Sequence, residues 1–227
     1  MSEYVNHVPT PSLKIYNCTQ RFALRRVYCI GRNYAEHALE MGHDPDREPP
    51  FYFQKSPDNL DQTGQFVMPV KSNNVQHEVE LVVALKSGGR NIRVEDAHQH
   101  IFGFALGLDM TRRDLQTQMK SLGRPWEIGK SFEGSAPIGL LQTIDDCPVL
   151  DNSEIKLTVN GELRQQGNIN QMLWNVNEII AYLSQYTQLD SGDLIMTGTP
   201  AGVGPVVAGD QLVASIGGLS NLEVSVT

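Results

Sequence analysis

Three carboxylates are the residues of this chain best suited to do chemistry together. Glu78 and Glu80 lie two positions apart in "HEVELVVAL", where apolar residues at 79, 81, 83 and 85 alternate with them. This period of two predicts a strand over 77–85 with both glutamates on one face. Two like charges about 6.7 Å apart repel by about 0.6 kcal/mol in water and by about 2–3 kcal/mol at an effective dielectric near 20. The pair is therefore either solvated at a sheet edge or, on a partly buried face, neutralised by a cation.

Asp109 offers a third carboxylate at the end of the apolar run "IFGFALGLD", just before a predicted helix. Alone, an aspartate in such a place is often an N-cap or a turn residue. Converging with Glu78 and Glu80, it would complete an all-oxygen site of the kind that binds Mg²⁺, Mn²⁺ or Ca²⁺. His77 is predicted to point to the opposite face, and "HEVEL" lacks the HExxH spacing of a zinc protease.

Two further groups of residues have the spacing for acid–base chemistry and for anion binding. His37 and Glu40 stand three apart on a predicted helix, where the carboxylate would orient the imidazole as a general base. A surface ion pair is the alternative. Arg113 and Gln116 follow Asp109 by four and seven residues and would hold a substrate carboxylate beside a metal, although both residue types are also ordinary on an exposed helix face.

Lys130 and a glycine-rich segment complete the candidates. Lys130 stands among turn residues in "WEIGKSFEG", where a lysine is usually solvated. The segment "TGTPAGVG" at 197–204 follows a predicted strand, so its backbone can approach a ligand closely, or it forms only a tight turn. It lacks both GK[ST] and GxGxxG, which argues against a nucleotide site.

The elements that position these residues are mostly strands. Apolar patterning predicts short helices from Asn33 to Gly42, over 94–101 and over 111–121 (opened by Thr111), and a longer helix over 170–187. Asn160-Gly161 predicts a hairpin turn. Further strands are predicted over 27–30, 51–54, 65–68, 77–85 and 102–108. The absence of a regular strand–helix alternation predicts an α+β, β-rich fold with mixed or antiparallel sheets in a sandwich or roll.

Composition excludes several classes of protein. The 227 residues carry a formal net charge of −8, which argues against binding to nucleic acid or an anionic membrane surface. No apolar run is long enough to span a membrane, and the N-terminus resembles no signal peptide. Three cysteines far apart and without a CxxC pair predict a reducing, cytoplasmic location.

Six stretches in order along the chain resemble the fumarylacetoacetate hydrolase superfamily, in particular its small acylpyruvate hydrolase and oxaloacetate tautomerase-like branch. They are "CIGRNYAEHALEMG", "HEVELVVAL", "GFALGLDMTRRDLQ", "GRPWEIGKSF", "LTVNGELRQQG" and "DLIMTGTPAGVGP". The resemblance covers nearly the whole chain. It implies a mixed β-sandwich roll with short flanking helices, a single catalytic domain over 1–227 and a homodimer.

The resemblance also implies roles for individual residues. Two departures are mild: Gly129 stands where the family usually has alanine, and "FYFQKSPDNL" is a variant of its F-x-K-P stretch. The large N-terminal domain of fumarylacetoacetate hydrolase itself is missing, which argues against that substrate. The implied metal ligands are Glu78, Glu80 and Asp109 for Mg²⁺ (Mn²⁺ or Ca²⁺ also fit), the implied catalytic residues are His37, Glu40 and Lys130, and the implied substrate-binding residues are Arg113, Gln116 and Thr199.

A 2-oxo acid suits such a site, because its C1 carboxylate and C2 oxygen chelate a divalent ion that stabilises the enolate formed at C3. The expected reaction is C3–C4 hydrolysis of a 2,4-dioxo acid such as acetylpyruvate or fumarylpyruvate, with His37 activating water. The same site would serve oxaloacetate tautomerisation or decarboxylation, or a 5-carboxymethyl-2-hydroxymuconate-type isomerisation. A non-catalytic Ca²⁺-stabilised β protein is the alternative from another class, and it has no use for His37, Glu40 and Lys130.

Overall fold

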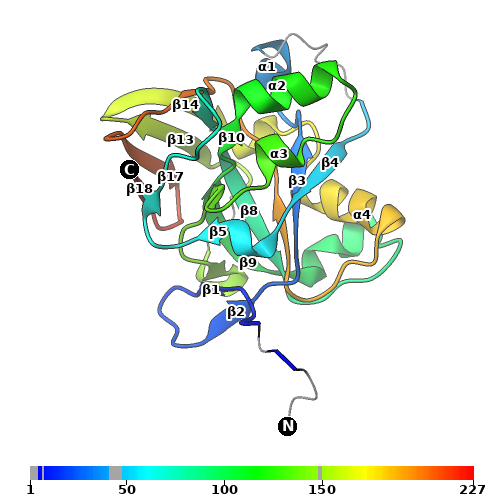
Figure 1. The fold of residues 1–227 in the computed structure, drawn as a ribbon. Coiled ribbons are helices and arrows are strands. Elements are labelled where there is room, and N and C mark those ends of the chain that lie inside the picture. The colour runs from blue at the N-terminus through cyan, green and yellow to red at the C-terminus, as the bar shows by residue number, and fades with distance from the viewer. Residues whose placement is uncertain (1–4, 7, 41–47, 148–149) are drawn as a thin grey trace.

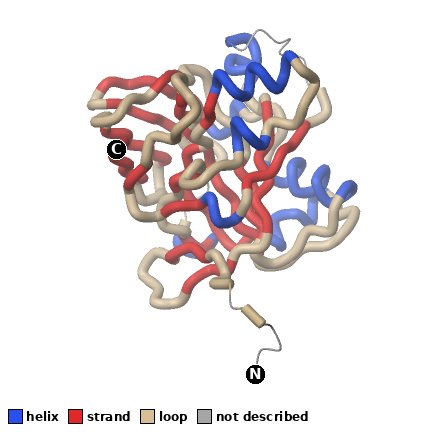
Figure 2. Tube along the Cα trace, in the orientation of Figure 1, coloured by secondary structure: helices blue, strands red, loops and turns tan. Residues whose placement is uncertain are grey.

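The computed structural model describes residues 5–6, 8–40, 48–147 and 150–227. Its centre is a six-stranded mixed sheet in which β15 runs parallel to β3 and the other neighbours are antiparallel (Figures 1 and 2). In spatial order its strands are β12 (Gln142–Thr143), β9 (Ile101–Leu108), β8 (Val79–Leu85), β15 (Asp193–Met196), β3 (Arg26–Gly31) and β4 (Phe51–Lys55).

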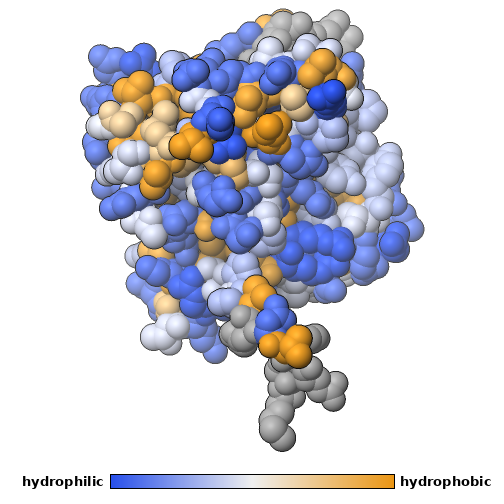
Figure 3. Space-filling view, in the orientation of Figure 1, coloured by the Kyte–Doolittle hydropathy of each residue, from blue (hydrophilic) through white to orange (hydrophobic). Residues whose placement is uncertain are grey.

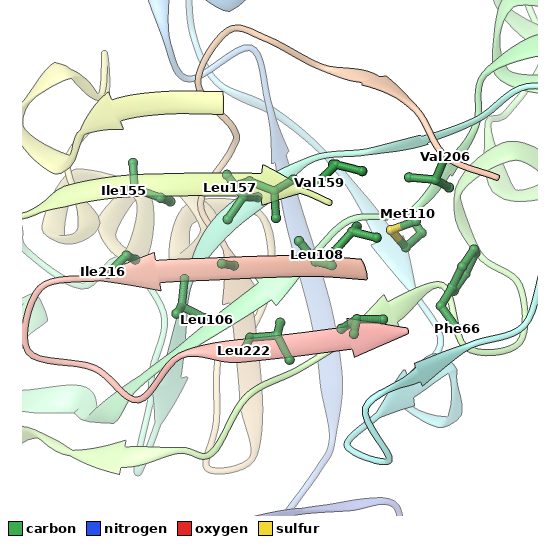
Figure 4. Packing of buried hydrophobic residues seen from close by; sticks show 14 of the residues in the cluster. Phe66, Leu106, Leu108, Met110, Ile155, Leu157, Val159, Val206, Ile216 and Leu222 are labelled. Carbon is green, nitrogen blue, oxygen red and sulfur yellow. The ribbon is translucent and has the colours of Figure 1, made fainter. Parts of the chain in front are cut away.

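A second, five-stranded sheet packs against part of the first. Its order is β14 (Glu162–Asn168), β13 (Glu154–Val159), β17 (Gln211–Ile216), β18 (Leu222–Val226) and β6 (Gln65–Phe66). Alternate side chains of β13 and β9, including Leu157, Leu106 and Leu108, fill the layer between the sheets (Figure 4). Burial of this apolar surface is the main stabilising contribution to the fold.

The remaining elements are short. A three-stranded sheet contains β10 (Thr111–Arg112), β7 (Val75–His77) and β16 (Gly204–Pro205), and two strand pairs join β1 (Ser12–Lys14) to β2 (Arg21–Ala23) and β11 (Ala136–Pro137) to β5 (Leu60–Asp61). The α-helices are α1 (Ala35–Glu40), α2 (Arg113–Ser121), α3 (Glu127–Lys130) and α4 (Val176–Tyr186). The 3₁₀ helices are η1 (Pro57–Asn59), η2 (Val94–His100), η3 (Ile144–Asp146) and η4 (Ile169–Gln171).

Helices cover the sheet where the second sheet does not. Val83 and Leu85 of β8 pack against α4 and η2, whereas Val79 and Leu81 on the same face belong to the core between the sheets. This arrangement confirms the predicted α+β, β-rich roll. No helix in the described ranges is long and apolar enough to cross a membrane. The face shown in Figure 3 is largely hydrophilic, with apolar side chains in small groups among polar ones.

The glutamate strand differs from its prediction in a way that matters for the site. It is broken at Glu78: β7 ends at His77 in the three-stranded sheet, and β8 begins at Val79 in the six-stranded sheet. Because β8 lies between β9 and β15 and is buried along its whole length, the solvated-edge alternative for the glutamate pair is wrong.

Two predicted helix starts are also wrong, because their polar side chains bond elsewhere. Thr111 lies in β10, and α2 begins at Arg113. Asn33 does not cap α1, since its amide accepts from Trp174 N and donates to Trp174 O and Thr197 O. The Gly42 end of that helix lies outside the described residues.

Other helix and strand boundaries differ from the predicted ones by a few residues. The helix predicted over 170–187 is η4 followed by α4, which Asn175 caps by accepting from Glu178 N at 3.0 Å. The strand predicted over 65–68 is β6, of two residues, and Lys130 ends a short helix instead of lying in a loop. The hairpin is confirmed: Asn160 and Gly161 turn between β13 and β14 with φ of 53° and 80°.

Candidate active site

The three predicted carboxylates meet in the structure. Glu78 comes from the β7–β8 junction, Glu80 from β8 and Asp109 from the end of the neighbouring strand β9. All three are buried, with 5 %, 2 % and 1 % exposure, and each has an oxygen within 4.8 Å of the others. Asp109 N donates to Glu78 O at 2.8 Å, which fixes the two chain segments against each other. A cluster of buried carboxylates this tight needs compensating positive charge.

Lys130 supplies part of that charge. Its ammonium donates to Glu78 Oε2 at 2.8 Å, to Asp109 Oδ2 at 2.7 Å and to Thr111 Oγ1 at 2.7 Å, which uses all three of its N–H groups. Burial would lower the pKa of Lys130, but Asp109 and Glu78 outweigh it and raise the pKa above its usual value. Lys130 is therefore a fixed cation at the floor of the site.

Lys55, at the end of β4, is a second buried lysine, which the sequence analysis missed. Its Nζ lies 2.9 Å from Asp109 Oδ1 and 3.3 Å from Met110 O, and it also donates to Lys130 O. Asp109 Oδ1 accepts no hydrogen bond from a described residue, so Lys55 compensates this buried carboxylate through its charge. The signal that points to Lys55 is its place in the variant F-x-K-P stretch "FYFQK".

Glu80 is held differently from the other two carboxylates. Its Oε2 accepts from Gly198 N at 2.8 Å, and among the described residues no cationic side chain forms an ion pair with it. Burial, then the charges of Asp109 and Glu78, raise the pKa of Glu80 well above its usual value. Gly198 has φ of +96°, and a Cβ there would lie 2.7 Å from Asn33 Cβ, so only glycine lets this N–H approach the carboxylate.

Arg113 connects the carboxylates to the first turn of α2. It donates through Nε to Gln76 Oε1 and through Nη1 to Gln116 Oε1, both at 2.7 Å, and through Nη2 to Glu78 Oε1. Although burial disfavours the charged carboxylate, Lys130 and Arg113 hold the pKa of Glu78 well below its usual value. The Gln116 amide oxygen is thus occupied by Arg113, which turns its N–H groups toward any ligand in the cavity.

His37 and Glu40 contact each other as the helix spacing predicts. His37 Nδ1 lies 3.3 Å from Glu40 Oε2, and Glu40 in turn accepts from Gly202 N at 3.2 Å. His37 is 7 % exposed, whereas Glu40 is an exposed residue. With Nδ1–H assigned to Glu40 by this network, Nε2 is the basic nitrogen of the imidazole, and it has no hydrogen-bond partner among the described residues.

Thr199 is positioned by Gln165, another residue that sequence analysis missed. Gln165 Nε2 donates to Thr199 Oγ1 at 2.8 Å and to Pro200 O at 2.9 Å, while its Oε1 accepts from Val79 N at 3.0 Å. The same oxygen lies 2.9 Å from His77 Nδ1, so His77 bonds away from the carboxylates, as predicted. Because Thr199 Oγ1 accepts from Gln165, its own hydrogen is available to a ligand.

One cavity gathers these groups. It is lined by eight of the nine residues that sequence analysis assigned to the site, and Glu40 lies behind His37. The chemistry of the donors fits a hard divalent cation, because the three ligands are carboxylates and Glu80 lacks a cationic partner in the described part of the chain. Lys55 and Gln165, which the sequence did not single out, hold the cluster from behind.

Comparison with known proteins identifies the family of this chain. The family model for the fumarylacetoacetate (FAA) hydrolase C-terminal region matches residues 26–227. The chain belongs to this family. A fumarylpyruvate hydrolase from a Ralstonia species shares 42 % identity over 82 % of this chain and 98 % of its own length. A mitochondrial oxaloacetate decarboxylase of Dictyostelium discoideum shares 40 % identity over 86 % of this chain and 90 % of its own length.

A solved structure of the FAA hydrolase family agrees with the fold over nearly its whole length. The fumarylpyruvate hydrolase of Pseudomonas aeruginosa, in complex with Mn²⁺ and pyruvate, superimposes with a TM-score of 0.95 at 46 % identity, covering 99 % of both chains. A mitochondrial oxaloacetate tautomerase of Homo sapiens shares 37 % identity over 89 % of this chain and 91 % of its own length. Relatives of this FAA hydrolase family member are therefore named for different reactions: hydrolysis, decarboxylation and tautomerisation.

Proposed function

We propose that this protein is a Mg²⁺- or Mn²⁺-dependent hydrolase that cleaves the C3–C4 bond of acylpyruvate-type 2,4-dioxo acids. The observation that carries the proposal is that the carboxylates Glu78, Glu80 and Asp109 and the imidazole of His37 line one and the same cavity. Similarity to fumarylpyruvate hydrolases, one of them in complex with Mn²⁺ and pyruvate, supports it.

Substrate binding would use the residues that border the carboxylates. A divalent cation held by Glu78, Glu80 and Asp109 would supply a Lewis acid for the C1 carboxylate and C2 oxygen of a 2-oxo acid. Gln116 and Thr199 have donors available on the same side of the cavity. Their hydrogen bonds would fix the 2-oxo acid with C4 toward His37.

The bond cleavage then follows from the position of His37. Its Nε2 takes a proton from water, the water oxygen bonds to C4, and the resulting tetrahedral centre collapses with cleavage of C3–C4. The electron pair moves toward C3 and the C2 oxygen, where the fixed charge of Lys130 stabilises it, and C3 takes up a proton. One water is consumed, and the products are pyruvate and the carboxylic acid of the acyl group.

Oxaloacetate decarboxylation or tautomerisation is the second candidate, because relatives at 37–40 % identity carry those names. Both reactions need the same stabilisation of negative charge at C3, but neither needs water to attack C4. A hydroxymuconate-type isomerisation would use the site in the same way. A purely structural Ca²⁺ site would leave His37 without a task in this cavity.

A substrate panel with and without metal tests the proposed function. We expect acetylpyruvate or fumarylpyruvate to be cleaved with Mg²⁺ or Mn²⁺, and the rate to fall at least about 100-fold after exhaustive chelation. Pyruvate release, CO₂ release and enol–keto exchange are measured separately, the latter two on oxaloacetate. Full cleavage after chelation would refute the role of the metal, and activity on oxaloacetate alone would favour the second candidate.

Gly129 gives a separate test of the ligand-binding helix. A Cβ at Gly129 would lie 2.9 Å from Gln116 N, so Gly129→Ala must push α2 away from α3. We expect KM to rise on the order of tenfold, because Gln116 and Arg113 move with the helix, while kcat changes less. The matched control is Gly217→Ala, whose Cβ would meet no atom within 4 Å. Equal kinetics of the two variants would contradict this positioning role.

We further propose that residues 1–227 form one catalytic domain that works as a cytoplasmic homodimer. The match of one family model to residues 26–227 supports a single domain. The homodimer and the location are supported by the family resemblance and by the three cysteines, which are all free.

A further inference from the structure

The cavity holds two cationic residues that the proposed reaction does not use. Arg32 and Lys120 line it together with the carboxylate cluster. Neither side chain forms an ion pair or a hydrogen bond with a described residue, and each lies over an aromatic ring. Lys120 is exposed and Arg32 is half-buried, whereas the metal-binding carboxylates are buried. The two cations therefore mark the outer part of the cavity, away from its floor.

Arg32 is held at this place by an unusual backbone. It follows β3 directly and has φ of 56°, in the left-handed region that a non-glycine residue rarely adopts. Its guanidinium lies over the ring of Phe51, 5.3 Å from the centroid. This contact places the guanidinium beside one of the rings that line the cavity.

Lys120 reaches the same region from α2. Arg113, Gln116 and Lys120 follow one another at spacings of three and four residues, which puts them along one face of the helix. The rise of about 1.5 Å per residue places Lys120 about 10 Å along the axis from Arg113. Lys120 Nζ lies 5.8 Å from the Trp126 ring centroid, and burial, then the nearby charges of Arg32 and Arg113, lower its pKa.

The charge of the cavity favours an anion with more than one carboxylate. Its lining contains the four cations Arg32, Arg113, Lys120 and Lys130 and the three carboxylates, a formal charge of +1. A bound divalent cation would raise this to +3. Since the inner cations are already paired with Glu78 and Asp109, the excess charge lies at the outer pair.

We propose that Arg32 and Lys120 form a subsite for a second carboxylate at the far end of the substrate, so that the enzyme selects 2,4-dioxo dicarboxylic acids over monocarboxylic ones. The inference rests on the proposed function, in which C1 and C2 lie at the carboxylate cluster. Phe51 and Trp126, whose rings pack edge-to-face with centroids 5.4 Å apart, also line the cavity and would form one apolar wall beside the acyl chain.

Length decides which dicarboxylic acids reach the subsite. An extended carbon chain advances about 1.2 Å per bond, as three backbone bonds span about 3.3–3.6 Å. A seven-carbon diacid thus extends about 7 Å, and a four-carbon diacid extends less than about 4 Å. Arg113 and Lys120 are about 10 Å apart along the axis of α2, and the flexible lysine side chain can reach back over part of this distance. The subsite therefore favours the longer diacid, and oxaloacetate leaves it unused.

Binding of two unreactive ligands tests the subsite independently of turnover. 2-Oxoheptanedioate and 2-oxoheptanoate have the same length and differ in the terminal carboxylate. Calorimetry on the Mn²⁺-loaded protein should show the diacid binding about 10–100-fold more tightly, as expected for charge-assisted hydrogen bonds. Arg32→Gln combined with Lys120→Gln should reduce this ratio to within about threefold of unity. A ratio that is already near unity in the natural protein, or that survives both substitutions, would overturn the proposal.

Kinetics with fumarylpyruvate and acetylpyruvate give the second readout. The double variant should lower the ratio of their kcat/KM values about 10–100-fold, mainly through KM for fumarylpyruvate. The control is Lys71→Gln combined with Lys86→Gln, which removes two exposed cations that do not line the cavity; Lys71 shares the positive φ of Arg32, at 69°. If neither substrate is cleaved, the proposed function fails, while the calorimetric ratio still decides the subsite.

Discussion

Replacing Glu80 with glutamine is expected to stabilise the metal-free protein and to remove its response to divalent cations. Burial and two neighbouring carboxylates raise the pKa of Glu80 in the fold. A carboxyl group with a raised pKa gives full stability below its unfolded pKa and loses it as the pH rises through the folded pKa. A neutral amide avoids this loss, and its oxygen can still accept from Gly198 N.

The size of both effects can be measured by thermal unfolding in EDTA and in Mn²⁺ or Mg²⁺. Removal of a buried charge without a cationic partner among the described residues should raise Tm by on the order of 2–5 °C in EDTA at pH 8. The natural protein should gain about 5–10 °C from a cation at 100 times its Kd, and the gain should increase with pH, because binding requires the ionised carboxylate. The variant should show almost no gain.

Glu78→Gln is the matched control. It neutralises a carboxylate of the same cluster, but one that is surrounded by positive charge, whereas Glu80 is surrounded by negative charge. Glu78 is paired with Lys130 and Arg113, so its loss leaves two buried cations short of a partner. We expect this variant to be destabilised by about 3–5 kcal/mol without metal. Destabilisation of both variants to the same extent, or an intact metal response in Glu80→Gln, would contradict this account of the site.

The glutamate pair shows what patterning can predict. Alternation with apolar residues predicted that Glu78 and Glu80 would lie close together, and they do. It could not predict that the strand changes sheets at Glu78, because that depends on which strands pair with β7 and β8. The partners come from segments 16 or more residues away, so the local alternation of residue types contains no information about them.

Tertiary contacts also explain the residues that were missed or misassigned. A lysine in a strand gives no local sign that it will be buried against Asp109, as Lys55 is. Thr111 has the residue type and place of an N-cap, but its hydroxyl accepts from Lys130 and donates to Asp109 O. In both cases the side chain is placed by a charged residue that is distant in sequence, Asp109 for Lys55 and Lys130 for Thr111. Only the order of motifs along the whole chain indicates that these residues belong to one site.

His37 should separate water-dependent cleavage from the other reactions of the cavity. We expect His37→Ala to lower kcat for acylpyruvate hydrolysis about 10²–10⁴-fold, the usual contribution of a general base. KM and the Tm gain with Mn²⁺ should change little, because His37 is not a ligand of the carboxylate cluster. Decarboxylation of oxaloacetate needs no activated water, so any such activity should fall less than tenfold.

Glu40→Gln tests whether the carboxylate acts through the imidazole. Glu40 Oε2 lies 3.3 Å from His37 Nδ1, and the amide oxygen of glutamine could still accept from Gly202 N, so the helix should keep its place. Without the negative charge the imidazolium formed during catalysis is less stable, and we expect kcat to fall about 10-fold or more while KM changes little. Because a merely structural pairing would change stability without lowering kcat, an unchanged kcat would remove Glu40 from the mechanism. Unchanged hydrolysis by His37→Ala would assign water activation to another group.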